Sequence, residues 1–122
     1  MIVDDPATRA EVEAAFAAYE RALMTNDVAA LDAFFLESEG AIRYGVAENL
    51  YGYDAIKAFR AARSAVGLAR TLEKTLIATY GRDLAVAATL FKRAGAPGKV
   101  GRQMQTWVRF PQGGGSSPPT SA

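Results

Sequence analysis

The chain has 122 residues, half of them apolar, and its 14 Lys and Arg against 13 Asp and Glu leave a net charge of +1. This length predicts one domain with a single core, and the balanced charge gives no reason to expect binding to nucleic acid or to an anionic membrane. The sequence has no Cys and no His, which excludes disulfides, thiolate nucleophiles, Ser-His-Asp triads and most zinc sites. We expect neither a metal site nor a cofactor.

The first residues, MIVDDPATRAEVEAAF, lack the basic and apolar regions of a signal peptide. No apolar run approaches the roughly 20 residues that a membrane span needs. We therefore expect a soluble cytoplasmic protein.

Two helices are predicted first. Residues 6–24 begin with Asp5 as N-cap and Pro6 in the first turn. An apolar stripe at helical spacing then predicts the buried face, with charged residues mainly off the stripe: the stripe is Val12, Phe16, Tyr19 and Leu23, and the charged residues are Arg9, Glu13, Glu20 and Arg21. The segment TND at 25–27 breaks this helix, with Asp27 as a cap, and starts a second one that buries Leu31, Phe34 and Phe35.

A short strand at 41–45 and a return segment at 48–52 follow, and Asp54 then opens a third helix over 54–65. Ile56 and Phe59 face inward in this helix. Its basic side consists of Lys57, Arg60 and Arg63, which by default is a solvated face.

Three strands are predicted next, at 70–80, 84–93 and 101–110, with turns at 81–83 and 95–98. The stretch 84–91, LAVAATLF, is apolar on both faces, so the sheet needs helices on one side and another cover on the other. We expect a second subunit to supply that cover. The remaining residues are rich in Gly, Ser and Pro and predict a disordered tail.

Two residues are candidates for chemistry, Tyr19 and Arg43. The Tyr19 hydroxyl is either a core group bonded to the backbone or a phenol that projects into a pocket. Arg43 lies in a short apolar strand and needs compensation, from a carboxylate such as Glu48, Asp32 or Glu37, from an exposed edge, or from an anionic ligand. The last alternative fits a guanidinium, which binds a carboxylate through two parallel hydrogen bonds.

Three tyrosines, Tyr44, Tyr51 and Tyr53, accompany Arg43 within RYGVAENLYGY, residues 43–53. They are candidates for the wall of a pocket, although such rings more often serve packing. We take them and Arg63 as candidate substrate-binding residues. The stretch has neither the spacing of a metal-binding loop nor a Gly-rich phosphate cradle, and no residue is an evident general base.

The order of elements resembles the cone-shaped α+β fold of the nuclear-transport-factor-2-like, or SnoaL-like, superfamily, with three helices against a curved, antiparallel-rich sheet. More narrowly, the chain from about Val12 to Pro111 resembles the AtzH-like family, which includes proteins of oxalurate and cyanuric acid catabolism. The segments that carry the resemblance are YERALMTNDVAALDAFF, IRYGVAENLYGYDAIKAFRAARS, YGRDLAVAATLFKR and GRQMQTWVRFP.

This resemblance implies a homodimer, a pocket between the helices and the sheet, and a small anionic urea-like substrate. The activity characterised in the family is a decarboxylating amidohydrolase that converts 1,3-dicarboxyurea to allophanate. Its catalytic tyrosine and arginine match Tyr19 and Arg43. Arg43 would bind a substrate carboxylate, and Tyr19 would donate a hydrogen bond to an oxygen on which charge develops. An amidase is a further candidate partner, since many relatives lie beside one or are fused to one.

The chain departs from the family pattern after Phe110, where relatives continue with a strand beginning near GWR. We therefore expect a domain at 1–111 that lacks its final strand, a disordered tail at 112–122, and unpaired edges on the strand 101–110 and on the short strand at Arg43. Two other functions remain open. One is a non-catalytic accessory or stabilising subunit of an amidase, for which strand 84–91 and Trp107 are a candidate interface. The other is a cone-fold isomerase or cyclase, which would need an Asp or His facing the pocket.

Overall fold

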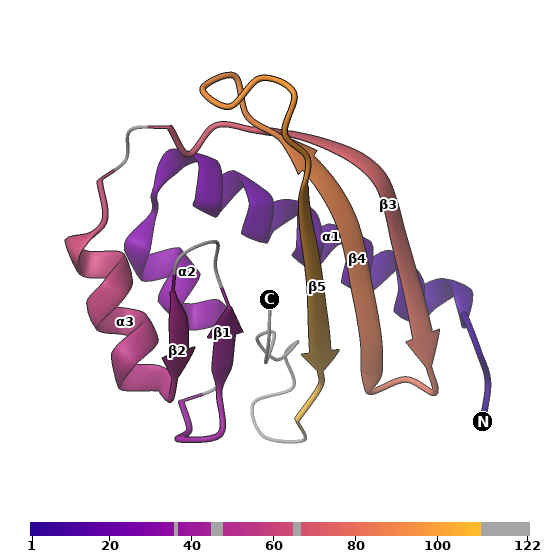
Figure 1. Ribbon diagram of the computed structural model, residues 1–122. Coiled ribbons are helices and arrows are strands. Elements are labelled where there is room, and N and C mark those ends of the chain that lie inside the picture. Colours follow the sequence, from indigo (N-terminus) through magenta and orange to yellow (C-terminus); the bar gives the residue numbers. More distant parts are fainter. Residues whose placement is uncertain (36, 45–47, 65–66, 111–122) are drawn as a thin grey trace.

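The computed structural model describes residues 1–35, 37–44, 48–64 and 67–110. Within these ranges β1 pairs antiparallel with β2, and β3, β4 and β5 form an antiparallel sheet in that order. The elements are α1 (Pro6–Thr25), α2 (Val28–Phe34), β1 (Ile42–Tyr44), β2 (Asn49–Tyr51), α3 (Tyr53–Ala62), β3 (Thr71–Tyr80), β4 (Leu84–Lys92) and β5 (Gly101–Val108). Figure 1 shows the sheet curving around α1, which confirms the expected α+β fold.

The ends of the first two helices follow the expected capping chemistry. The Asp5 carboxylate accepts hydrogen bonds from the backbone N–H of Thr8 at 3.1 Å and from its hydroxyl at 2.8 Å, which satisfies a donor that the first turn leaves free. At the other end Asn26 adopts the left-handed conformation with φ 53° and ends α1. Asp27 then caps α2 by accepting a hydrogen bond from the Ala30 N–H at 3.2 Å.

The third helix differs from expectation in its start and in the residues that it buries. It begins at Tyr53, after Gly52 as N-cap with φ 89°, and Asp54 lies in its first turn without capping it. The default interpretation of its basic side is wrong for Arg60, which has no exposed surface. Arg60 lies one turn after the buried Ile56, so the two share the inward face.

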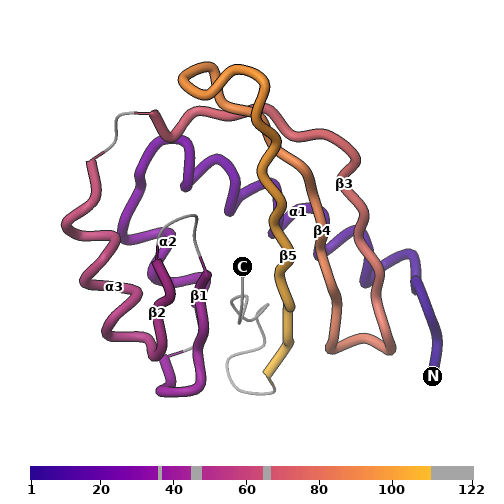
Figure 2. Tube along the Cα trace, viewed as in Figure 1, coloured from indigo at the N-terminus to yellow at the C-terminus, as the bar shows by residue number. Residues whose placement is uncertain are grey.

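The sheet bends at an irregular point in β3. Lys74 has φ 50°, and the pairing with β4 shifts register between Glu73 and Leu76. Such a bulge bends a strand and increases its twist, in keeping with the curved path of β3 in Figure 2.

The core lies between α1, α2 and the inner face of the sheet. Aromatic rings from three elements meet there: Tyr19 of α1, Phe34 of α2 and Trp107 of β5 have ring centroids 5.7–6.4 Å apart. Trp107 is only 4% exposed. The proposal that Trp107 contributes to an interface is therefore wrong, because its ring is part of this core.

The outer face of the sheet remains partly apolar and uncovered in the single chain. Leu76 is 69% exposed, Met104 58% and Leu84 41%. Side chains alternate between buried and partly exposed along β4, so the strand has apolar residues on both faces, as predicted.

Within the described part of the chain, β5 pairs only with β4 and β1 only with β2. The expected domain limit at residue 111, the missing strand and the tail at 112–122 concern residues outside the described ranges. No helix in those ranges is both long enough and apolar enough to span a membrane.

Candidate functional site

A cavity of about 410 Å³ lies between the helical part of the molecule and the inner face of the sheet. Its lining includes four of the six residues that the sequence singled out, Tyr19, Arg43, Tyr44 and Arg63. Tyr19 and Arg43 therefore line the same cavity. The rest of the lining is Leu23, Glu48, Phe59, Leu68, Arg70, Phe91, Arg93, Gly101, Arg102 and Gln103.

Tyr19 reaches the cavity from the middle of α1. Its ring is 2% exposed and packs edge-on against Phe34 and Trp107. Of the two alternatives for its hydroxyl, the described residues supply no backbone partner, and Tyr19 lines the pocket. The hydroxyl oxygen accepts a hydrogen bond from Arg60 Nη2 at 3.2 Å.

Arg43 reaches the cavity from β1 and is 9% exposed. Its Nη1 donates to Glu48 Oε1 at 2.8 Å, so Glu48 is the carboxylate partner among the three considered. Its buried Nε has no hydrogen-bond partner among the described residues. Arg43 therefore has both a carboxylate partner and a free donor at the cavity.

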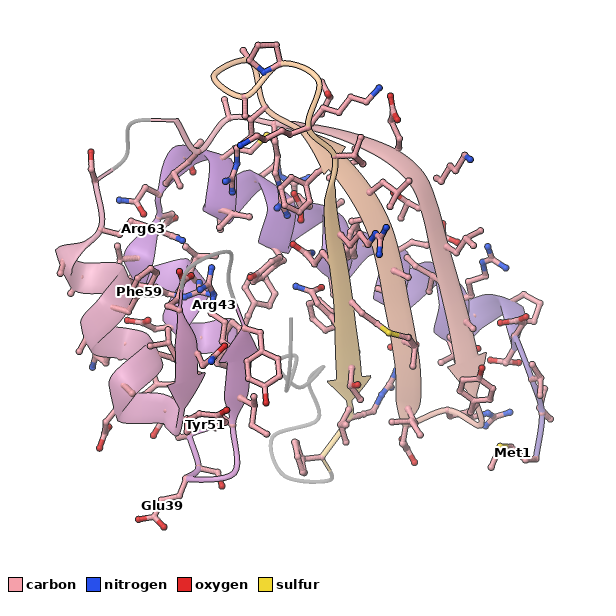
Figure 3. The ribbon with its side chains drawn as sticks, in the orientation of Figure 1. Met1, Glu39, Arg43, Tyr51, Phe59 and Arg63 are labelled. Carbon is pink, nitrogen blue, oxygen red and sulfur yellow. The ribbon has the colours of Figure 1, made fainter. Side chains whose placement is uncertain are left out.

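Arg43 and Arg63 both lie close to one phenylalanine ring, and we call Arg43, Phe59 and Arg63 the helix wall of the cavity. The guanidinium carbons of Arg43 and Arg63 lie 5.3 and 5.6 Å from the Phe59 ring centroid, and Figure 3 shows the three side chains grouped between α3 and the β1–β2 hairpin. Phe59 and Arg63 are one helical turn apart, which brings the two side chains together. Burial, followed by the positive charges of Arg43 and Arg60, lowers the pKa of Arg63 to about 10.

A second set of the same composition lies across the cavity, and we call Arg70, Phe91 and Arg93 the sheet wall. The Arg70 and Arg93 guanidinium carbons lie 4.4 and 5.1 Å from the Phe91 ring centroid. Partial burial, then the charges of Arg70 and Arg43, lower the pKa of Arg93. A side chain on Gly101 would place its Cβ 2.1 Å from Phe91 Cζ, so only glycine leaves room for this ring.

Arg70 is held by a closed polar network. Its Nε donates to Glu20 Oε2 at 3.0 Å, and its Nη2 donates to Glu20 Oε1 at 2.5 Å and to Gln103 Oε1 at 2.6 Å. Gln103 Nε2 in turn donates to Glu20 Oε1 at 3.3 Å. The side chains of Arg70 and Glu20 are 3% and 6% exposed. Glu20 is therefore buried at the edge of the apolar stripe of α1. The sequence had grouped it with the charged residues that lie mainly off that stripe.

The structure does not bring Tyr51 and Tyr53 to this cavity. They line a separate, open depression near the start of α3, and Tyr51 lies below the helix wall in Figure 3. The Tyr51 hydroxyl is 3.4 Å from that of Tyr44, and this hydrogen bond raises the pKa of Tyr51. Partial burial, followed by the negative charge of Asp32, raises the pKa of Tyr53.

The arrangement favours a small anion. Five arginines line the cavity, and Glu48 is the one carboxylate among its described lining residues. Buried Nε atoms of Arg43, Arg63 and Arg93 lack hydrogen-bond partners in the described ranges, and a carboxylate oxygen would satisfy such donors. The described residues contain no cluster of His, Cys, Asp or Glu that could hold a metal ion.

Comparisons with known proteins agree with this fold. The model of the AtzH-like family matches residues 1–115. A protein of unknown function from Pectobacterium atrosepticum is 50% identical, with a TM-score of 0.91 over 98% of this chain and 90% of its own. A cystatin-like fold protein from Burkholderia xenovorans is 40% identical, with a TM-score of 0.93 over 99% of this chain and 92% of its own.

A more distant solved structure shows the fold alone. An NTF2-like protein of unknown function from Pseudomonas putida is 18% identical, with a TM-score of 0.72 over 96% of this chain and 84% of its own. No curated protein matched the sequence.

Proposed function

Because the chain belongs to the AtzH-like family, we propose that it is a small-molecule catabolic enzyme, a decarboxylating amidohydrolase acting on dicarboxyurea-like or oxalurate-derived anions. The observation that carries the proposal is the pair of arginine walls around one cavity of about 410 Å³. The helix wall offers free donors of Arg43 and Arg63, and the sheet wall offers one of Arg93, to the two ends of a small anion that has a carboxylate at each end.

The proposed roles combine what the family resemblance implies with the contacts that each side chain makes. Arg43 binds one carboxylate through its fork of donors, of which Nε has no described partner. Tyr19 donates a hydrogen bond from its hydroxyl to the carbonyl or carbamate oxygen of the substrate and keeps its proton. As the carbamate C–N bond breaks, CO2 leaves, the bonding electron pair remains on nitrogen, and the nitrogen takes up a proton from solvent. A hydrogen bond to the oxygen that carries the developing charge lowers the barrier of this step.

The direct test is CO2 release from 1,3-dicarboxyurea by the purified chain, with oxalurate as a comparison compound that has one carboxylate and no carbamate group to lose. We expect turnover that falls about 100-fold in Tyr19→Phe, a loss typical of removing one donor to a developing oxyanion. The control is Tyr80→Phe, since Tyr80 lies in β3 and does not line the cavity. Turnover that is equal in wild type and Tyr19→Phe would remove Tyr19 from the proposed mechanism, and no CO2 release from 1,3-dicarboxyurea would contradict the reaction itself.

The alternative is a non-catalytic accessory or stabilising subunit of an amidase. The outer face of the sheet favours this alternative, because Leu76, Leu84 and Met104 are exposed there and apolar area of this kind is typical of interaction surfaces. Co-expression with an amidase of the amidase-signature type tests it. A stable complex together with an inactive isolated chain would support the accessory role over the catalytic one.

We also propose that the same outer face joins two copies of this chain as a homodimer. Light scattering coupled to gel filtration measures the molar mass of the chain in solution. We expect a dimer for the wild type and a monomer for Met104→Glu, because a carboxylate at this position would be desolvated in the interface. The matched control is Lys99→Glu, which changes an exposed residue outside the strands. A monomeric wild type would contradict the dimer.

A further inference from the structure

Arg60 is a buried cation that the proposed reaction does not use directly. It has no exposed surface, and its guanidinium carbon lies 4.6 Å from the Phe35 ring centroid and 5.8 Å from that of Tyr19. No carboxylate lies within ion-pair distance of it among the described residues, and its Nε and Nη1 have no hydrogen-bond partners there. Burying a guanidinium in such surroundings costs free energy. The one hydrogen bond described for Arg60 therefore calls for an explanation.

That hydrogen bond ends on the hydroxyl that faces the cavity. Arg60 Nη2 and the Tyr19 oxygen are 3.2 Å apart. A guanidinium only donates hydrogen bonds, so the Tyr19 oxygen must accept this one. The phenolic proton of Tyr19 is then left to donate to another acceptor, and the ring that carries it lines the cavity.

A comparison with Arg70 shows that the contact between Arg60 and Tyr19 differs from the usual way of burying an arginine. Arg70 is also buried, but a carboxylate and an amide occupy its donors. Arg60 instead packs against the rings of Phe35 and Tyr19, and its described hydrogen bond goes to the Tyr19 hydroxyl. Hydrogen bonds in a chain polarise one another, so a donor behind the Tyr19 oxygen strengthens the bond that its proton makes in front.

We propose that Arg60 is a positioning residue for Tyr19. It fixes the hydroxyl oxygen and directs the phenolic proton into the cavity, toward an oxygen atom of the bound anion. The identity of that anion rests on the proposed function, whereas the contact between Arg60 and Tyr19 does not.

The first experiment examines the contact without any ligand. In protein labelled with 13C at tyrosine Cζ, the resonance missing from Tyr19→Phe is that of Tyr19, and this carbon reports the hydrogen bonding of its hydroxyl. We expect the resonance to move in Arg60→Met and in Arg60→Lys, because both variants lose Nη2. It should stay in place in Arg21→Met, which changes an exposed residue of the same helix as Tyr19. An unchanged Tyr19 resonance in either Arg60 variant that folds overturns the proposal.

A reciprocal measurement leaves Arg60 in place. In protein labelled with 15N at arginine, Tyr19→Phe removes the acceptor of Arg60 Nη2, and we expect one guanidinium resonance to shift and to exchange faster with water. The same spectrum of Tyr44→Phe serves as the control, since Tyr44 has no described hydrogen bond to an arginine. Guanidinium resonances that are identical in wild type and Tyr19→Phe overturn the proposal even if no Arg60 variant folds.

The second experiment asks whether Arg60 acts through Tyr19 in binding. Oxalurate affinity is measured for wild type, Arg60→Lys, Tyr19→Phe and the double variant. We expect each single change to weaken binding about fivefold to tenfold, the range of one lost hydrogen bond, and the double variant to bind no more weakly than Tyr19→Phe. Losses that multiply would show that Arg60 acts independently of Tyr19 and would overturn the positioning role. If oxalurate fails to bind the wild type, that result counts against the proposed function, and the two spectra still decide the role of Arg60.

Discussion

The two walls of the cavity have the same composition, a phenylalanine ring and two arginines close to it, yet their charges are compensated differently. In the sheet wall, Arg70 makes three hydrogen bonds within a network that includes Glu20 and Gln103. In the helix wall, Arg43 makes one hydrogen bond to Glu48 and leaves a buried Nε without a described partner. A guanidinium whose donors are already used supports the structure, and one with unused donors is available to a ligand. Residue type alone therefore does not separate the two roles.

The largest effect should come from removing Arg70. Arg70→Met leaves Glu20 buried without its cation, and breaking a buried pair in this way costs about 3–5 kcal/mol. We expect the melting temperature to fall by more than about 10 °C, since each kcal/mol corresponds to several degrees in a domain of this size. Arg102→Met is the control, because Arg102 is an exposed arginine at the same cavity. A melting temperature that stays near that of wild type would show that the network does not stabilise the sheet wall.

Arg43→Lys should have the opposite effects, a large loss of activity and little loss of stability. A lysine keeps the charge but loses the fork of donors, so we expect turnover of dicarboxyurea to fall about 100-fold, in the range seen when a charged hydrogen-bonded pair is disrupted. The melting temperature should change little, because the introduced lysine retains a cation beside Glu48. CO2 release and thermal melting of the same preparation measure both quantities. A variant with full turnover and a large loss of stability would instead mark Arg43 as structural.

Gly101→Ala tests how closely the sheet wall is packed. The added Cβ would lie 2.1 Å from Phe91 Cζ. The Phe91 ring must therefore shift from its position beside Arg70 and Arg93. We expect a loss of about 1–3 kcal/mol in the free energy of unfolding, the usual cost of overpacking, measured by chemical denaturation. Gly95→Ala is a matched control, since nothing lies within 4 Å of a Cβ built there. Equal stability of the two variants would show that Phe91 has room to move.

Arg63→Gln should have the smallest effect on stability, with a positive sign. The pKa of Arg63 in the folded chain is about 10, well below its usual range, so its charged form is less favourable in the folded state than in the unfolded state. At neutral pH the variant should therefore melt a few degrees higher than wild type, a modest gain because Arg63 is only partly buried. As pH rises through about 10, Arg63 of the wild type loses its proton. The melting temperatures of wild type and variant should then become equal.

The same substitution should weaken anion binding. Oxalurate affinity is expected to fall in Arg63→Gln at neutral pH, and in wild type as pH rises through about 10, because the charged guanidinium attracts the anion. Calorimetric titration over that pH range measures both. A variant that is less stable than wild type at neutral pH, or that binds oxalurate equally well, would contradict this account of the helix wall.

Local patterns were sufficient to predict most of the fold. The apolar stripe of α1 placed Tyr19 on the inward face, and Asp5 and Asp27 act as caps where the sequence indicated them. Arg60 shows the limit of this approach, because a basic residue on a helix was assigned by default to solvent. Its position four residues after Ile56 was the available signal, since both residues are buried on the same face.

The sheet wall was missed because it depends on pairing between distant residues. Arg70 precedes β3 and Arg93 follows β4, and each appeared in the sequence as a residue at the end of a strand. The register pairs Thr71 with Lys92, which brings the two arginines to the same end of the hairpin. The predicted hairpin, 70–80 with 84–93, already contained that information. The partner of Arg70, Glu20, lies 50 residues away, and no local pattern indicates such a contact.

The surplus of guanidinium groups in the cavity has a consequence for the speed of association. A concave site lined by one sign of charge draws oppositely charged molecules toward it, and the capture rate falls as dissolved ions screen the field. Anion capture by this chain should therefore slow steeply with ionic strength, while escape of the bound anion changes little. Phosphate, sulfate and citrate in a buffer carry the same sign of charge as the substrate, so they would compete for the arginines. Affinities measured in such buffers would describe an exchange of anions and would be weaker than those measured in a dilute zwitterionic medium.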